Sequence, residues 1–298
     1  MKQRAITSIY IVLASLLAIF SKLLPNSIGD YIFDIFILAV TIVAGFEICS
    51  ILQKNNRKLN KIMATFYCVV NYATLLICVK NRVDFHLILA IELAVLGVYW
   101  LVSLLIEFFK DKNALGKQHL ITSFNTLLAC VYPSFLFCLL LNLNHSEVYA
   151  GAKYFSFIFI VTIFVITWLT DTFAYLVGRT LKGPKLAPKI SPNKTISGAI
   201  GGLLGGIIGS MLVYLIINCI GGLSEVLNFV SWWHFLLIGA IGSACGQIGD
   251  LFESKLKRNA GIKDSGNIFP GHGGMLDRID AMIFISTFVY VVIFLLLL

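Results

Sequence analysis

The residues best suited to chemistry gather in one polar run, Ser254–Asp280, near the carboxyl end of the chain. Eight of the 38 charged residues lie in these 27 positions, and Asp250 and Glu253 come just before them. Apolar segments flank the run on both sides, and glycines are mixed with its charges. Carboxylates beside cations are groups that can hold a metal ion and a chain of phosphates. We therefore expect a polyphosphate and metal site here.

Four aspartates are the candidate metal ligands: Asp250, Asp277, Asp280 and Asp171. Asp277 and Asp280 are three positions apart at the start of the last apolar segment, which places them on one face of a helix. Carboxylates gathered at a membrane edge repel one another unless a cation neutralises them. Their hard oxygen atoms suit Mg²⁺, which often bridges a protein carboxylate and substrate phosphates. Salt bridges to Arg258 and Arg278 are the alternative.

A glycine-rich segment, GIKDSGNIFPGHGG, lies between these acids. Glycine permits left-handed backbone conformations and lets the chain approach a ligand closely. Consecutive N–H groups in such turns bind anions. Lys263 and His272 add donors, and Asp264 lies beside Lys263. The spacing is not that of a Walker A loop, and His272 is equally compatible with a structural and a catalytic role.

A second basic segment, TLKGPKLAPKISPNK, precedes the glycine-rich stretch that follows Thr195. Its glycine and three prolines break helical structure. Lys185, Lys189 and Lys194 make it a candidate phosphate-binding loop. Ser191 or Asn193 is placed to cap the next helix, whose N-terminal dipole favours anions. Attraction to acidic lipid headgroups, about 1 kcal/mol per cation, is the alternative, and an anionic lipid substrate would use both.

The elements that must position these segments are long and apolar. The chain of 298 residues is 58% hydrophobic and 13% charged, whereas a soluble domain carries about 25% charge. Apolar runs of roughly 20 residues, long enough to cross a bilayer, recur throughout. Transmembrane β-strands would be shorter and alternating. We predict an all-α polytopic membrane protein whose nine spans are Ile6–Leu24, Tyr31–Leu52, Ile62–Val79, Phe85–Phe108, Leu120–Leu141, Tyr154–Val177, Thr195–Ile220, Trp232–Phe252 and Ala281–Leu298.

The distribution of cations predicts the orientation of these spans. With a cytoplasmic N-terminus, all but four of the 23 lysines and arginines lie on the cytoplasmic side. The exceptions are Lys22, Lys80, Arg82 and Lys153. The positive-inside rule therefore favours a cytoplasmic N-terminus. It also accounts for the net charge of +8, so nucleic-acid binding is not required.

The two halves of the chain differ, and we divide it into residues 1–151 and 152–298. The first half contributes membrane spans with few acids. Asp34 and Glu47 fall near predicted span ends, where water is close, while Glu92 is deeper. Acids inside a membrane span are functional hypotheses by default, although an interfacial or hydrogen-bonded role is equally compatible. The second half carries the polar segments and is the expected catalytic region.

Glycines recur four residues apart in the two spans that precede the polar run. Gly201, Gly205 and Gly209 form one such ridge, and Gly202 and Gly206 form another. Small residues at this spacing let helix backbones approach closely in lipid. Close packing would hold Asp171, Asp250 and the polar loops near one another.

The C-terminal motifs resemble the signature of the phosphatidate cytidylyltransferases, also called CDP-diacylglycerol synthases. That signature has a serine followed by KR, then KD and a small residue, then PxHGG and DRxD. The matching residues are Ser254, Lys257, Arg258, Lys263, Asp264, Gly266, Pro270, His272, Gly273, Gly274, Asp277, Arg278 and Asp280. Upstream, Asp171 with Ala174-Tyr175 and Gly178-Arg179 looks like the family's SDxxAYxxGR element, and KLAPKISPNKT looks like its KLxPxISPxKT loop. The resemblance covers roughly residues 155–298.

The resemblance implies Mg²⁺-dependent transfer of CMP from CTP to phosphatidic acid, with CDP-diacylglycerol and pyrophosphate as products, in phospholipid biosynthesis. A phosphate monoester is itself an anionic nucleophile, so the site must chiefly bring two anions together and stabilise the leaving pyrophosphate. The implied catalytic residues are Asp250, Lys263, Asp264, His272, Asp277 and Asp280. The implied phosphate-binding residues are Lys189, Ser191, Lys194, Arg258 and Lys263. Asp250 and Asp277 are the first choice as Mg²⁺ ligands, and Asp280 and Asp171 support them.

The implied partners are CTP, phosphatidic acid and the surrounding membrane lipids, with a homodimer left open. The implied location is a bacterial inner membrane, with the active site on the cytoplasmic side. Thr170 stands where the family usually has serine, and Ile196-Ser197 stand where it commonly has an aromatic residue and an acid.

Other functions remain as alternatives. A polyprenol or lipid kinase would release a nucleoside diphosphate, and a membrane transporter would tend to place acids at mid-membrane. A CDP-alcohol phosphotransferase would need glycine after the DxxD pattern, where this chain has Ala281.

Overall fold

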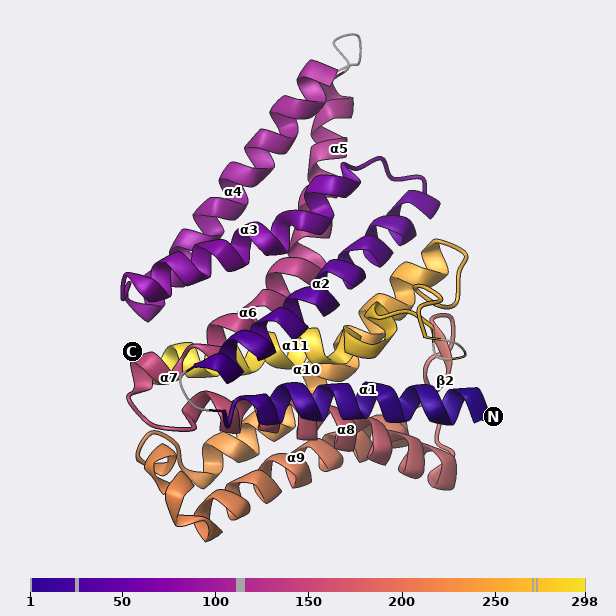
Figure 1. The fold of residues 1–298 in the computed structure, drawn as a ribbon. Coiled ribbons are helices and arrows are strands. Elements are labelled where there is room, and N and C mark those ends of the chain that lie inside the picture. Colours follow the sequence, from indigo (N-terminus) through magenta and orange to yellow (C-terminus); the bar gives the residue numbers. More distant parts are fainter. Residues whose placement is uncertain (1, 25–26, 111–115, 270, 272, 298) are drawn as a thin grey trace. The chain divides into compact units, whose positions relative to one another are not determined.

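The computed structural model describes residues 2–24, 27–110, 116–269, 271 and 273–297. It is built mainly of long α-helices, which confirms the predicted all-α membrane fold (Figure 1). Within the described residues, eight helical segments are long and apolar enough to cross a membrane: Ile28–Lys54, Lys61–Lys80, Phe85–Lys110, Gly116–Ala150, Phe155–Leu181, Ile196–Cys219, Trp232–Asn259 and Leu276–Leu296. The first helix contributes a shorter apolar stretch, Ile9–Ser21. The count of nine spans and the side of the N-terminus therefore stay predictions.

The helices in chain order begin with α1 (Lys2–Ser21), α2 (Ile28–Lys54), α3 (Lys61–Lys80), α4 (Phe85–Lys110) and α5 (Gly116–Ala129). The Gly116–Ala150 segment continues through the π-helical turn η1 (Cys130–Phe135), α6 (Leu136–Asn144) and α7 (Glu147–Ala150). The remaining elements are α8 (Phe155–Leu181), β1 (Lys185–Ala187), β2 (Ser191–Thr195), α9 (Ile196–Cys219), the 3₁₀ helix η2 (Gly221–Asn228), α10 (Trp232–Asn259) and α11 (Leu276–Leu296).

Apolar side chains cover the outer faces of these helices as well as their contacts. Leu93, Val98 and Leu105 of α4, for example, are about half exposed. In lipid such side chains meet hydrocarbon, and the backbone must satisfy its hydrogen bonds internally. The long apolar runs therefore form helices, although the Gly116–Ala150 segment has non-helical backbone angles at Tyr132, φ −116° and ψ 120°.

The chain divides into two compact units. The first unit comprises residues 1–141 and 256–278, and the second comprises residues 142–255 and 279–298. Most of the C-terminal polar run thus clusters with the N-terminal helices rather than with the helices on either side of it in the sequence.

In the first unit, α2 packs against α1 and α3, and α3 also packs against α4. The two acids of α2 are buried, since Asp34 is 0% and Glu47 is 6% exposed. Asp34 accepts a hydrogen bond from the Tyr72 hydroxyl at 2.9 Å. The expectation that both acids lie close to water is therefore wrong, because each carboxylate is buried against another segment of the unit, Asp34 at Tyr72 and Glu47 at residues 265–276.

In the second unit, α8 and α9 lie side by side over much of their length (Figure 1). A β-carbon on Gly205 would lie 2.5 Å from the carbonyl oxygen of Leu169 in α8. On the other ridge, a β-carbon on Gly206 would lie 2.5 Å from Cβ of Ser243 in α10. The two glycine ridges thus serve two different neighbours, which confirms the close packing predicted from their spacing.

The basic segment before α9 forms a small antiparallel hairpin, β1 and β2, where the sequence predicted an irregular loop. Its end leads directly into α9. The helix is capped by Thr195, whose hydroxyl accepts a hydrogen bond from the Gly198 N–H at 3.0 Å. The predicted caps, Ser191 and Asn193, are wrong because both lie within β2 and the helix begins only at Ile196.

Candidate active site

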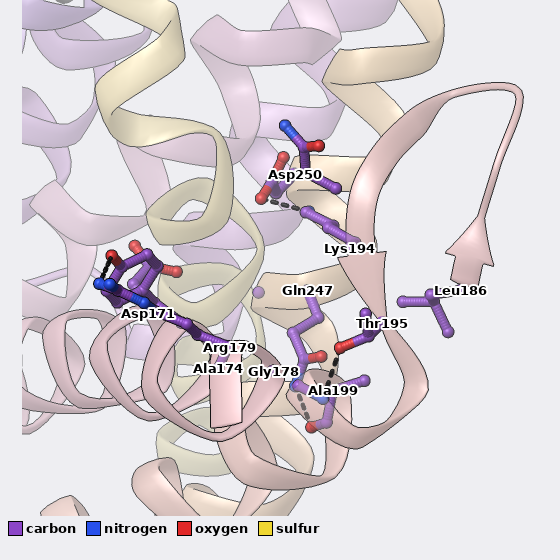
Figure 2. Close-up of a pocket in the computed structure, with 14 residues that line it drawn as sticks. Asp171, Ala174, Gly178, Arg179, Leu186, Lys194, Thr195, Ala199, Gln247 and Asp250 are labelled. Atoms are coloured by element: carbon purple, nitrogen blue, oxygen red, sulfur yellow. Dashed lines mark hydrogen bonds and ion pairs between the residues drawn. The ribbon is translucent and has the colours of Figure 1, made fainter. Parts of the chain in front are cut away.

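The second unit contains a cavity of about 510 Å³ between α8, the hairpin, α9 and α10 (Figure 2). It carries two aspartates, Asp171 and Asp250, and two cations, Arg179 and Lys194. Its other lining residues are Ala174, Tyr175, Gly178, Leu186, Asn193, Thr195, Gly198, Ala199, Gly246 and Gln247. The upstream DxxAYxxGR motif and the end of the basic loop therefore meet in one cavity.

Asp250 and Lys194 form an ion pair on one side of the cavity (Figure 2). Both side chains are about one-third exposed, at 31% and 29%. The Ser254 hydroxyl donates to the other carboxylate oxygen of Asp250 at 3.3 Å. The lysine thus presents positive charge to the cavity while Asp250 keeps it in place.

Asp171 lies apart from this pair (Figure 2), on α8 and two turns before Arg179. Nη1 of Arg179 donates to the Tyr175 hydroxyl at 2.9 Å. All three side chains are exposed to the cavity or its mouth. The cavity is therefore lined by the Asp250–Lys194 ion pair and by Asp171 and Arg179 at separate positions along α8.

Hydrogen bonds between elements fix the cavity walls. Nε2 of Gln247 in α10 donates to the Ala199 carbonyl oxygen in α9 at 3.2 Å. The Ser197 hydroxyl accepts from the Gly183 N–H at 3.1 Å and lies 3.1 Å from the Thr195 hydroxyl. Ser197 therefore closes the base of the hairpin.

Lys189 and Ser191 do not line this cavity. Lys189 is exposed in the turn between the strands, and Ser191 pairs with Ala187 across the hairpin. Their predicted contacts with phosphate stay predictions.

The first unit holds the signature loop, which we define as the described residues 263–269, 271 and 273–277. Asp277 is its most strongly bonded acid. Oδ1 of Asp277 accepts from the Lys257 ammonium at 2.5 Å. Oδ2 accepts from the Ser265 N–H at 2.9 Å, the Ser265 hydroxyl at 2.9 Å and the Gly274 N–H at 2.8 Å. The carboxylate thus closes the loop on itself, and its side chain is only 6% exposed.

A glycine is required beside this carboxylate. Gly273 adopts φ +84°, and a β-carbon there would collide with Oδ2 of Asp277. The predicted need for glycine in this loop is confirmed at this position, where both the conformation and the close approach exclude a side chain.

The other predicted residues of the polar run occupy varied positions. Lys263 and Asp264 are exposed in the loop. Nη1 of Arg258 donates to the Ile262 carbonyl oxygen at 3.0 Å and closes the turn after α10. The backbone of Asp280 packs closely against Gly249 of α10 in the second unit. His272 lies outside the described residues.

The donor set of the cavity fits a Mg²⁺ site completed by substrate. Among the described residues, no group of three or more histidine, cysteine, aspartate or glutamate side chains is arranged to hold a metal ion. Asp171 and Asp250 nevertheless supply hard carboxylate oxygens to one cavity. Mg²⁺ is commonly held by one or two carboxylates together with phosphates and water. The predicted ligand set of four aspartates stays a prediction.

Sequence reasoning did not predict the contacts with which three residues organise the signature loop: Lys257, Ser265 and Glu47. The alternative considered for the acids was pairing with Arg258 and Arg278, whereas the cations found on Asp250 and Asp277 are Lys194 and Lys257. Glu47 of α2 accepts hydrogen bonds from three groups of residues 265–276. The signal available in the sequence was a charged carboxylate inside an apolar span, which indicates that it has polar partners.

The fold and the site define a class: a helical integral membrane protein with a cavity of mixed charge suited to a phosphorylated ligand. Comparison with known families specifies it further. The model of the cytidylyltransferase family matches residues 2–296. The chain belongs to the cytidylyltransferase family, which confirms the resemblance seen in its motifs.

Three relatives illustrate the similarity. A phosphatidate cytidylyltransferase of Bacillus subtilis is 32% identical over 290 residues, which are 97% of this chain and 96% of that protein. The protein of the same name from Thermotoga maritima is 29% identical over 254 residues, or 85% and 84% of the two chains. That of Brucella abortus is 44% identical over 140 residues, so the match spans about half of each protein, at 47% and 48%.

Proposed function

We propose that this protein is a phosphatidate cytidylyltransferase, which transfers CMP from CTP to phosphatidic acid and releases pyrophosphate. The observation that carries the proposal is the cavity of the second unit, where the motif residues Asp171, Arg179, Lys194 and Asp250 meet. The relative from Bacillus subtilis, named for this activity and aligned over nearly the full length of both chains, supports it.

The reaction forms one bond and breaks another. A phosphate oxygen of phosphatidic acid attacks the α-phosphorus of CTP, and the bond from that phosphorus to the oxygen bridging the α- and β-phosphates breaks. The electron pair leaves on pyrophosphate. Because the attacking group is already an anion, no side-chain nucleophile is needed, and charge compensation is the main requirement.

The cavity residues meet that requirement in distinct ways. Lys194, held by Asp250, and Arg179, held by the Tyr175 hydroxyl, would bind phosphate oxygens of the two substrates. Asp250 and Asp171 would hold Mg²⁺. When bound, Mg²⁺ supplies charge neutralisation for the triphosphate and the leaving pyrophosphate. Asp277 would add to this set, as the motif resemblance predicts, and Asp280 would support it.

We further propose that the enzyme works in a bacterial inner membrane with its cavity on the cytoplasmic side. The bias of lysine and arginine toward one set of loops supports this orientation. A cytoplasmic opening would give access to CTP, while the lipid substrate reaches the site from the bilayer. The formation of a homodimer, which the sequence left open, would be tested by measuring the particle mass of the purified protein.

The test is incubation of the purified protein with CTP, vesicles containing phosphatidic acid, and Mg²⁺. We expect pyrophosphate and CDP-diacylglycerol in equal amounts, with neither formed when the lipid or the metal is left out. Release of CDP with a phosphorylated lipid would instead identify a lipid kinase. A folded protein with no turnover would favour a transporter and overturn the proposal.

A further inference from the structure

Glu47 lies in α2, far from the motifs in sequence, yet its carboxylate is bonded to the signature loop. Oε1 accepts from the Met275 N–H at 3.0 Å, and Oε2 accepts from the Leu276 N–H at 2.8 Å. Oε2 also accepts from the Ser265 hydroxyl at 2.9 Å. The residue is 6% exposed, so these three donors replace water around a charge that is costly to bury.

The position of these donors gives Glu47 a defined structural role. Leu276 is the first residue of α11, and the first N–H groups of a helix have no partner within the helix. A carboxylate there satisfies them and interacts favourably with the positive end of the helix dipole. Glu47 therefore caps α11 at the point where the signature loop ends and Asp277 follows.

The Ser265 hydroxyl links Glu47 to Asp277. It lies 2.9 Å from Oε2 of Glu47 and 2.9 Å from Oδ2 of Asp277. A hydroxyl has one proton, so it can donate to only one of these two carboxylates at a time. A change in charge at one acid therefore alters the hydrogen bond available to the other.

The signature glycines fit around the Glu47 carboxylate. A β-carbon on Gly266 would collide with Oε1, and the atoms nearest to it all belong to the Glu47 side chain. A β-carbon on Gly274 would collide with the same carboxylate and with the Ser265 hydroxyl. Two glycines of the motif are thus required by an acid that lies outside it.

We propose that Glu47 is a positioning residue for cytidylyl transfer. It fixes the signature loop and, through Ser265, sets the hydrogen bonding of Asp277. The inference rests on the proposed function and on the predicted role of the loop in it. Glu47 itself touches neither substrate.

The first test compares Glu47→Gln with Asp34→Asn. Asp34 is also a buried acid on the same helix, and its carboxylate accepts a hydrogen bond from the Tyr72 hydroxyl. Glutamine keeps the shape of Glu47 but places an amide donor against one of the loop donors. We expect Glu47→Gln to lower kcat by about 10- to 100-fold, the range found when a residue supporting a metal ligand is lost, with little change in KM for CTP. Asp34→Asn should retain most of the activity.

Two readouts separate positioning from a loss of folded protein. Hydrogen exchange at the Met275 and Leu276 amides should become faster in Glu47→Gln and stay unchanged in Asp34→Asn. The Mg²⁺ concentration for half-maximal rate should also rise, which a smaller folded fraction alone would not cause. Wild-type kcat and unchanged exchange in Glu47→Gln would overturn the inference while leaving the proposed function intact. A wild-type protein without turnover would overturn the proposed function itself.

A second pair of variants tests the contact if Glu47→Gln folds poorly. Gly266→Ala should impair turnover and stability, because its methyl group meets the Glu47 carboxylate. In a Glu47→Ala background the same methyl group enters vacated space, so Gly266→Ala should cause no further loss. Equal losses from Gly266→Ala in both backgrounds would show that the Glu47 contact does not constrain the loop.

Discussion

The pair formed by Lys257 and Asp277 allows the stability of the signature loop to be separated from its chemistry. The two side chains are 10% and 6% exposed and meet at 2.5 Å. We compare Lys257→Met, Asp277→Asn and the double variant. Methionine keeps the length of the lysine stem without its charge, and asparagine keeps the shape of the aspartate.

The magnitude follows from burial. Removing one partner of a buried ion pair costs about 3–5 kcal/mol because the other charge is left uncompensated. In Lys257→Met the carboxylate keeps the N–H donors of Ser265 and Gly274, and it shares the Ser265 hydroxyl with Glu47. We therefore expect a loss near the lower end, about 3 kcal/mol. Asp277→Asn gives the buried ammonium a neutral amide oxygen in place of a carboxylate, so we expect a loss in the same range. The double variant removes both charges of this pair and should recover most of either loss.

The assay has two parts, thermal unfolding in detergent and pyrophosphate release at saturating CTP and Mg²⁺. The double variant should unfold near the wild-type temperature yet remain inactive, because Asp277 is expected to act at the reaction centre. Turnover close to wild type in the double variant would show that Asp277 has no such role. Additive losses of stability would show that the ion pair is not the contact that matters.

Two further predictions concern the cavity of the second unit. Gly205→Ala should lower the unfolding temperature and the activity, because overpacking against Leu169 costs about 1–3 kcal/mol. As a control, Gly97→Ala in α4, where a β-carbon meets nothing within 4 Å, should raise stability by up to about 1 kcal/mol through helix propensity. Equal shifts of the unfolding temperature in calorimetry would contradict the close packing of α8 and α9. Lys194→Met should raise the KM for CTP by about tenfold or more, since a hydrogen bond to a charged group is worth about 1.5–3 kcal/mol. The control Lys117→Met, which changes an exposed lysine, should leave the KM for CTP unchanged. An unchanged KM for Lys194→Met in steady-state kinetics would show that Lys194 does not bind the phosphates.

Much of the fold is dictated by local patterns that a sequence displays directly. Apolar runs long enough for the bilayer become helices because lipid offers the backbone no other hydrogen-bond partner. The spacing of Gly205 and Gly206 likewise predicts two packing faces, since neighbouring positions on a helix point in different directions. Short-range preferences were less reliable in the basic loop. Ser191 and Asn193 are good capping residues, but strand pairing placed them in β2 and left Thr195 at the helix start.

The candidate site was predictable where motifs carry it and hidden where its partners are remote. Asp171, Lys194 and Asp250 were all named from the sequence, and they line one cavity. The contacts of Glu47 join residues 218 to 229 positions apart, which no local periodicity can reveal. The energetic cost of burying this carboxylate was nonetheless a signal present in the sequence. A carboxylate within an apolar span is costly and must find donors, and a helix that starts after a glycine-rich loop has unpaired N–H groups that need an acceptor. Matching such acids to such a helix start is a physical criterion that would have placed Glu47 among the candidate partners of α11.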